Sequence, residues 1–254
     1  MKRLLAAIAT ATLGLLTLTA APATAATTAR IDTGGGAANL RYGPGTMYHV
    51  TGTVANGSSV TVVCTTRSQT VNGPYGSSTI WNKLSNGSWV ADAITFTGVS
   101  YPVEGECPAT GRRPTGDDYP YRGNPNIVDR WAMYSGQCTS FVAWRMEQLQ
   151  GYFHNNGWRN GIAGHWGNAH EWNDNAVRLG YRVDRTPRVG AIAQFEPYAG
   201  GASSLGHVAY IAGVSADGTS VTLQEYNWAT PLGWGTRTVP MSQISNVIHY
   251  AAGT

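Results

Sequence analysis

Closely spaced hairpin-turn signals between residues 30 and 98 constrain the fold of this chain more than any other feature. Short runs rich in Val, Ile, Thr and Trp are separated by turn residues about every ten positions. Asn-Gly occurs at Asn56, Asn72 and Asn86, and both residues of that pair tolerate the positive φ of hairpin turns. We therefore expect a small antiparallel barrel or sandwich. Its single histidine has no nucleophile beside it, which indicates a binding or spacer module.

The N-terminus carries the pattern of an export signal. Lys2 and Arg3 precede an apolar run over residues 4–18, and Ala23 and Ala25 form an A-x-A site. The run is shorter than the roughly 20 residues that a membrane span needs. We expect a secretory signal peptide at residues 1–25, and a secreted protein, extracellular or cell-wall associated, with no stable membrane association after cleavage.

Charge argues against one class of partner. The formal net charge is +3, with two of the positive charges from Lys2 and Arg3, and charged residues make up only 12% of the chain. No basic patch or run suggests nucleic acid, so we expect none as a partner. The 9 Trp and 13 Tyr could stack on sugars, although core packing is the commoner use of any single Trp.

Three cysteines leave one unpaired in an exported chain. Cys64 and Cys107 both lie in the first half, and we expect them to form a disulfide because an oxidising compartment permits it. The loop of roughly 40 residues would contribute about 3–4 kcal/mol. Cys138 then stays free.

The pattern changes after a Pro- and Gly-rich stretch at residues 108–125, which is a linker or an ordered lead-in. Residues 126–254 mix α and β signals. Apolar residues at helical spacing predict a helix with Ser135 as N-cap and Gly151 as its stop, and a second helix ending at Gly180. Strands are expected over residues 189–196, 206–215, 219–228 and 235–241.

Cys138 falls in the first turn of its expected helix. Free N–H groups and the helix dipole favour a negative charge there, which lowers a thiol pKa. A buried structural cysteine is the alternative, but an exported protein gains little from an inert free thiol.

A histidine and a carboxylate follow from the hairpin around Ala216-Asp217-Gly218. A turn centred near residue 216 places His207 directly opposite Glu225, at the polar end of an otherwise apolar face. A one-residue shift of register would break this pairing. Thiolate, imidazole and orienting carboxylate together predict a cysteine hydrolase. No H-x-x-x-H or C-x-x-C pair is present, so we expect neither a metal nor another cofactor.

Two stretches resemble known families. "NLRYGPGTMYHVTGTVANGSSVTVVC" with "WNKLSNGSWVADAI" resembles a bacterial Src-homology-3-like domain, which we place at residues 30–107. This resemblance implies recognition of the cell wall, typically of peptidoglycan peptides.

"GQCTSFVAW", "GHVAYI" and "QEYNW" resemble the CHAP family, the cysteine, histidine-dependent amidohydrolases/peptidases. The resemblance implies a papain-like α+β domain with an antiparallel sheet. With the small all-β barrel expected at the N-terminal side, the fold class expected for the chain is α+β. By position it makes Cys138 the nucleophile, His207 the base and Glu225 the orienting acid, with Asn227 a further polar member.

These patterns predict a secreted peptidoglycan hydrolase, either an N-acetylmuramoyl-L-alanine amidase or an endopeptidase. The Cys138 N–H, aided by the Gln137 side chain, would stabilise the oxyanion, and the groove candidates are Trp166, Trp172 and Trp228. A wall-binding protein with a catalytically silent second domain is the alternative. A hydrolase of proteins or small amides is a third reading.

Overall fold

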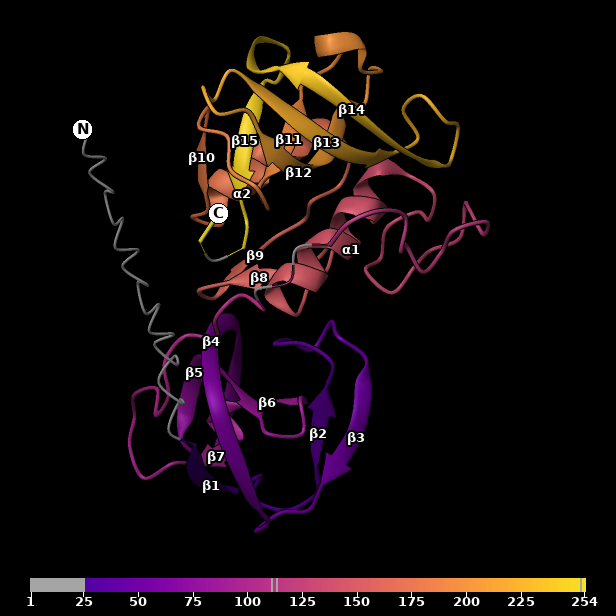
Figure 1. Ribbon diagram of the computed structural model, residues 1–254. Coiled ribbons are helices and arrows are strands. Elements are labelled where there is room, and N and C mark those ends of the chain that lie inside the picture. Colours follow the sequence, from indigo (N-terminus) through magenta and orange to yellow (C-terminus); the bar gives the residue numbers. More distant parts are fainter. Residues whose placement is uncertain (1–25, 111, 113, 252) are drawn as a thin grey trace, which may run out of the picture.

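Strands make up most of the regular secondary structure of the described chain. The computed structural model describes residues 26–110, 112, 114–251 and 253–254. The expected signal peptide lies outside these residues. Two antiparallel sheets of seven and six strands lie one above the other, with helix α1 between them (Figure 1).

The first sheet is curled and uses only antiparallel pairs, in the order β3-β2-β6-β5-β4-β1-β7. Its strands and one 3-10 turn are β1 (Thr27–Ile31), β2 (Ala38–Arg41), β3 (Val50–Val54), β4 (Ser59–Gly73), β5 (Gly76–Leu84), β6 (Trp89–Ala91), η1 (Asp92–Ile94) and β7 (Thr95–Phe96). The turns at Asn56 and Asn86 have a following glycine with positive φ, as expected. The turn near Asn72 is displaced, because Gly73 pairs with Gly76 and so Pro74 and Tyr75 form its tip.

The second unit places its two α-helices on one face of a sheet with the order β10-β15-β11-β12-β13-β14. Its elements are α1 (Cys138–Gln150), β8 (Trp158–Arg159), β9 (Ile162–Ala163), η2 (Ala169–Glu171), α2 (Trp172–Arg178), β10 (Arg182–Asp184), β11 (Ile192–Phe195), η3 (Ala199–Gly201), β12 (His207–Val214), β13 (Ser220–Tyr226), β14 (Trp234–Pro240), η4 (Met241–Gln243) and β15 (Asn246–His249). The sequence pattern did not indicate β8, β9, β10 or β15, which are short.

The two faces of the six-stranded sheet bury different clusters. Val208, Tyr210 and Tyr226 point to the side of α1 and α2. Ala209 and Leu223 point to the opposite side, with Phe195 among others. This alternation is the period of two that a strand imposes on a half-buried sequence.

The β12–β13 hairpin differs in register from the expectation, but His207 and Glu225 still lie on the same face of the sheet. Tyr210 pairs with Gln224, so Glu225 is not directly opposite His207 but two residues away along the same face. Nearer the turn, Val214 pairs with Val221, a register that would put His207 and Glu225 on opposite faces. A one-residue bulge between Ile211 and Gly213 removes that mismatch.

Helix α1 begins one position after Gln137, which is the N-cap, so the expected N-cap at Ser135 is wrong. Gly151 ends it in the left-handed region at φ 88°, as expected. The prediction of one apolar face was incomplete. Residues Ser140 to Gln150, apart from Trp144, are all buried, because the helix packs on the sheet and also faces the first unit.

The described part of residues 108–125, which leaves out residues 111 and 113, is not a free linker. Tyr119 is buried in the core of the second unit, and Asp118 bonds both Arg145 and Gln148 of α1. The Thr110 N–H donates to the Leu149 carbonyl at 2.6 Å. The stretch is therefore an ordered lead-in that supports α1, the other interpretation open at the level of sequence.

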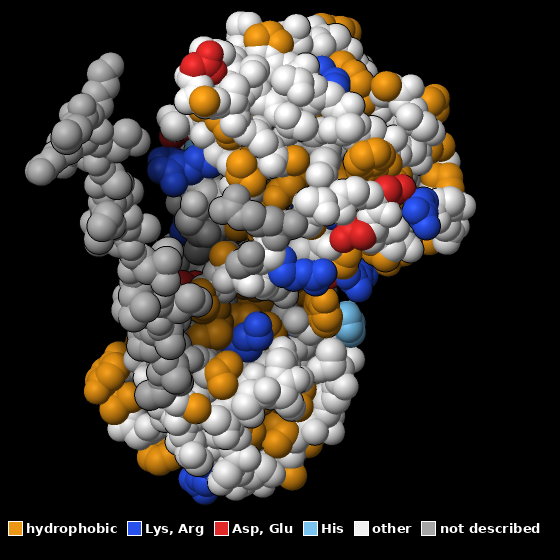
Figure 2. All heavy atoms as spheres, in the orientation of Figure 1, with side chains coloured by type: hydrophobic (Ala, Val, Ile, Leu, Met, Phe, Trp, Pro, Cys, Tyr) orange, Lys and Arg blue, Asp and Glu red, His pale blue; other side chains and the backbone are white. Residues whose placement is uncertain are grey.

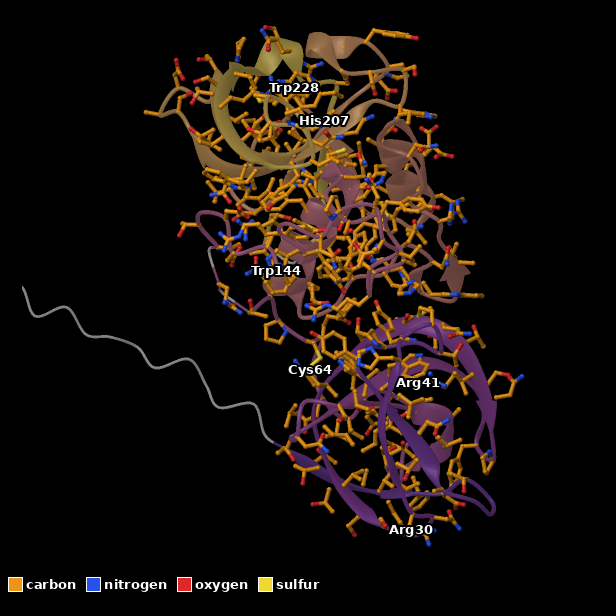
Figure 3. The ribbon with its side chains drawn as sticks, turned by 90° about the vertical axis from the view of Figure 1, so that its right-hand side faces the viewer. Arg30, Arg41, Cys64, Trp144, His207 and Trp228 are labelled. Atoms are coloured by element: carbon orange, nitrogen blue, oxygen red, sulfur yellow. A yellow bond between two sulfur atoms is a disulfide. The ribbon has the colours of Figure 1, made fainter. Side chains whose placement is uncertain are left out.

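The expected Cys64–Cys107 disulfide is confirmed and Cys138 is free. The disulfide lies where the two units meet (Figure 3). Tyr152 of the second unit packs edge-on against Trp89 of β6, with 5.7 Å between ring centroids. The Tyr42 hydroxyl donates to Glu147 of α1 at 3.0 Å.

Charged side chains are sparse on the face in Figure 2, and both signs are present.

Candidate active site

Cys138 is the first residue of α1 and is partly exposed at the wall of a groove. The chain reaches it through Gly136, whose φ of 79° suits glycine. A Cβ on Gly136 would lie 2.8 Å from Pro125 Cβ. The thiol accepts hydrogen bonds from the backbone N–H groups of Thr139 and of Val208 in β12. The helix start therefore surrounds the sulfur with donors that stabilise a thiolate.

His207 opens β12 and hydrogen-bonds the Cys138 thiol. Gly206 before it has φ 71°, and a Cβ there would lie 2.6 Å from the Phe195 carbonyl oxygen. This close approach seats His207 against β11, where it pairs with Phe195. The glycine before each reactive residue thus has a steric reason.

Glu225 holds the far side of the imidazole. His207 Nε2 lies 2.9 Å from Glu225 Oε2, and the two side chains are only 4% and 2% exposed. That bond leaves Nδ1 for the sulfur. The second carboxylate oxygen, Oε1, accepts from Arg237 Nε at 2.7 Å. A buried carboxylate with both oxygens occupied has one orientation available to it.

The thiol and the imidazole shift each other's proton affinity. Burial raises the pKa of the Cys138 thiol, but the charge and hydrogen bond of His207 and the two N–H groups outweigh it, so the pKa is lowered. Burial lowers the pKa of His207, but Cys138 and then Glu225 outweigh it and raise the pKa to about 9. The site therefore favours a thiolate–imidazolium pair.

The groove beside this pair has a volume of about 1190 Å³. Trp228 lines it, with its ring centroid 4.7 Å from that of His207 (Figure 3). Trp166 and Trp172 do not line it, and those two expectations are wrong. They are 1% and 0% exposed and pack against Phe153 in the core under the helices, where an indole buries more apolar area than it would at the groove.

Gln137 and Asn227 meet at the groove. Asn227 Nδ2 donates to Gln137 Oε1 at 2.8 Å, and Asn227 Oδ1 accepts from the Leu232 N–H. Both polar groups of Asn227 are thus engaged away from the imidazole. The bond directs the Gln137 carbonyl to Asn227 and leaves the Gln137 amide hydrogens free to donate into the groove.

The sequence patterns did not identify Arg237 as a residue of the site. Its guanidinium carbon lies 3.9 Å from the centroid of the Trp228 ring, besides the bond to Glu225. A signal existed, since Arg237 alternates with Val239 on the inward face of an expected strand.

Among the described residues, no group of three or more His, Cys, Asp or Glu side chains could hold a metal ion. Within the same residues, no helix has the length and apolarity needed to cross a membrane.

Comparison with known proteins places these residues in a family. The family model described as "CHAP domain" matches residues 128–227, which include Cys138, His207, Glu225 and Asn227. Those residues therefore form a CHAP domain.

Curated relatives match more of the chain. The N-acetylmuramoyl-L-alanine amidase sle1 of Staphylococcus saprophyticus is 28% identical over 233 residues, which cover 84% of this chain and 64% of that protein. The probable autolysin SsaALP of Staphylococcus aureus is 34% identical over 126 residues, covering 49% of this chain and 42% of that protein. This chain thus spans less than two thirds of either relative.

One solved structure, an N-acetylmuramoyl-L-alanine amidase from Staphylococcus aureus, is 30% identical. It has a TM-score of 0.38, with 52% of this chain and 36% of that chain covered.

Proposed function

We propose that this protein is a secreted peptidoglycan hydrolase that cleaves amide bonds by a Cys-His-Glu mechanism. The observation that carries the proposal is the chain of contacts Cys138–His207–Glu225 at the wall of an open groove. Thiolate, imidazolium and orienting carboxylate are the parts that a cysteine hydrolase needs. The CHAP domain and the names of the staphylococcal relatives support the wall as the substrate.

In this mechanism the Cys138 thiolate attacks the amide carbonyl carbon, and the carbonyl oxygen becomes an oxyanion. The Cys138 N–H and the Gln137 amide hydrogens, directed by Asn227, stabilise that charge. The His207 imidazolium gives its proton to the amide nitrogen, the C–N bond breaks and the amine leaves. Water then attacks the thioester with His207 as base, and the carboxylic product departs from the regenerated thiolate.

The scissile bond we favour is the amide between the sugar and the stem peptide, because a relative that covers 84% of this chain carries the name of an N-acetylmuramoyl-L-alanine amidase. A peptide-bond endopeptidase would use the same residues. Mass spectrometry of the released fragments separates the two, since the amidase leaves peptides that begin with a free alanine amine.

For the first unit we propose a bacterial Src-homology-3-like barrel that holds the enzyme at the wall, over residues 30–107. For the second we propose a papain-like α+β fold over residues 126–254. The curled antiparallel sheet and the packing of α1 on a six-stranded sheet support these assignments. After removal of residues 1–25, the protein would be extracellular or cell-wall associated.

The direct test incubates purified walls with wild type and with Cys138→Ala, and measures new amines. We expect the variant to release none above background. A conservative control is Val177→Ala, an exposed residue of α2 that does not line the groove. Equal release by Cys138→Ala and wild type would reject the thiol mechanism, and retained cutting by His207→Ala would remove the base assignment.

A further inference from the structure

Arg237 connects three side chains of the candidate site, two on different strands and one in the loop that follows β13. It extends from β14, and its Nε donates to Glu225 Oε1 of β13 at 2.7 Å. Its guanidinium stacks on Trp228 at 3.9 Å and lies 5.2 Å from the centroid of Phe195 in β11. Trp228 in turn contacts the His207 ring at 4.7 Å.

Arg237 is largely buried, and its contacts are with residues of the candidate site. Its side chain is 20% exposed, and its carboxylate partner is 2% exposed. Its Nη2 atom is buried and has no hydrogen-bond partner among the described residues. The aromatic faces compensate for that missing bond through cation–π attraction. A guanidinium in such a place is oriented by one carboxylate and two rings.

Several charges surround His207, and Arg237 is the cation among them. Helix α1 contributes Cys138, β13 contributes Glu225 and β14 contributes Arg237. Strand β11 contributes apolar Phe195 opposite His207, followed by Glu196, whose carboxylate accepts from Asn246. Element η2, which also contacts β12, contributes His170 and Glu171, the latter accepting from the Asn168 N–H. The other charged residues of α1, Arg145 and Glu147, lie about two turns along the helix from Cys138. Tyr226 of β13 points to the opposite face of the sheet from Glu225.

We propose that Arg237 is a positioning residue. Its hydrogen bond to Oε1 of Glu225 directs Oε2 of the same carboxylate to the imidazole. Its positive charge offsets the negative charge of Glu225, and Cys138 therefore remains a thiolate at lower pH than it would without Arg237. The role builds on the hydrolase function proposed above.

The sign of the effect follows from the charges. A nearby positive charge favours a thiolate and disfavours an imidazolium, so its removal raises the pKa of both Cys138 and His207. Loss of one charge beside a buried pair shifts the thiolate titration upward by roughly one pH unit. A purely structural role would lower stability without moving that titration.

The experiment measures the rate of Cys138 alkylation by iodoacetamide against pH, with the product identified by intact mass. The other two cysteines form the disulfide, so one alkylation reports one thiol. Arg237→Gln and Arg237→Met remove the charge, and Arg237→Lys keeps it. Arg30→Gln is the matched control, because it breaks an exposed arginine–aspartate pair at 3.6 Å in the other sheet. Circular dichroism confirms the fold of each variant.

We expect the midpoint to rise by about one pH unit in Arg237→Gln and Arg237→Met, and to stay close to wild type in Arg237→Lys and Arg30→Gln. Unchanged midpoints in the uncharged variants would overturn the proposal, as would an equal rise in Arg237→Lys. If neither uncharged variant folds while Arg237→Lys does, Arg237 is structural and the proposal is rejected. The readout needs no wall substrate, so wild type that alkylates as expected but releases no amine would reject the hydrolase function alone.

Discussion

At the residue scale, one proton shared between a thiol and an imidazole governs the site. The Cys138 pKa is lowered and that of His207 is raised to about 9, so the charged pair exists between the two titrations. Below the pKa of Cys138, the nucleophile is protonated. Above the pKa of His207, the imidazolium that must protonate the leaving amine has lost its proton.

We therefore expect a bell-shaped pH profile of amine release, with its alkaline limb near pH 9. The acid limb should lie below the usual titration of a cysteine, because the thiol pKa is lowered. The measurement is kcat/KM on soluble wall fragments across pH, compared with the alkylation profile of Cys138. An alkaline limb near the ordinary histidine value of about 6.5 would contradict the ion pair.

At the scale of elements, α1 is held by a buried arginine that a surface helix would not contain. Arg145 is 0% exposed, bonds Asp118 of the lead-in and donates to the Gly116 carbonyl oxygen. It also donates to Gln148 Oε1 and to Gln224 Oε1 of β13, at 2.7 Å and 2.8 Å. One side chain thus ties the lead-in, the helix of the nucleophile and the strand of Glu225.

Replacing Arg145 with Met should destabilise the protein by about 2–4 kcal/mol, because several buried acceptors lose their donor at once. Half-exposed Asp118 softens the loss, since water can reach it. Urea unfolding followed by tryptophan fluorescence gives the value. Arg122→Met is the control, because its side chain is 69% exposed and its contact with Asp117 is 3.8 Å long. If Arg145→Met is as stable as Arg122→Met, Arg145 does not stabilise the packing of α1 on the lead-in and β13.

At the scale of the whole molecule, the two sheets share one junction around α1 and the disulfide. Ser68 of β4 donates to the Trp158 carbonyl of β8 at 3.1 Å, and Tyr42 bonds Glu147 of α1. The nucleophile is at the opposite end of α1 from Gly151, which lies beside Lys83 of the first sheet. The first unit can therefore stabilise the helix without entering the groove.

Replacing both Cys64 and Cys107 with Ser should lower the free energy of unfolding by about 4 kcal/mol, because a loop with a sequence separation of 43 residues is released in the unfolded chain. Amine release by the folded variant should equal that of wild type. Urea midpoints and the wall assay measure the two effects. A loss of activity without a loss of stability would show that the disulfide acts on the site instead.

Much of the site follows from local pattern. The apolar period places Cys138 in the first turn of its helix, although the expected N-cap at Ser135 is two residues too early. Strand alternation places His207 on one face with Ala209 and Ile211, and Glu225 on one face with Leu223. Two glycines stand before the reactive residues because the backbone there needs positive φ and close packing. All of these depend on neighbours within a few positions in the chain.

Other features depend on partners far apart in sequence, and only the tertiary structure decided them. The bulge near Ala212 determines which side of β12 meets Glu225, and no turn signal marks it. Trp166 and Trp228 are both indoles, but one fills the core and the other covers His207. Periodicity reports which side of an element is apolar. It does not report which element covers that side, and so neither the burial of α1 on nearly all sides nor the contact of Arg237 with Glu225 could be read in advance.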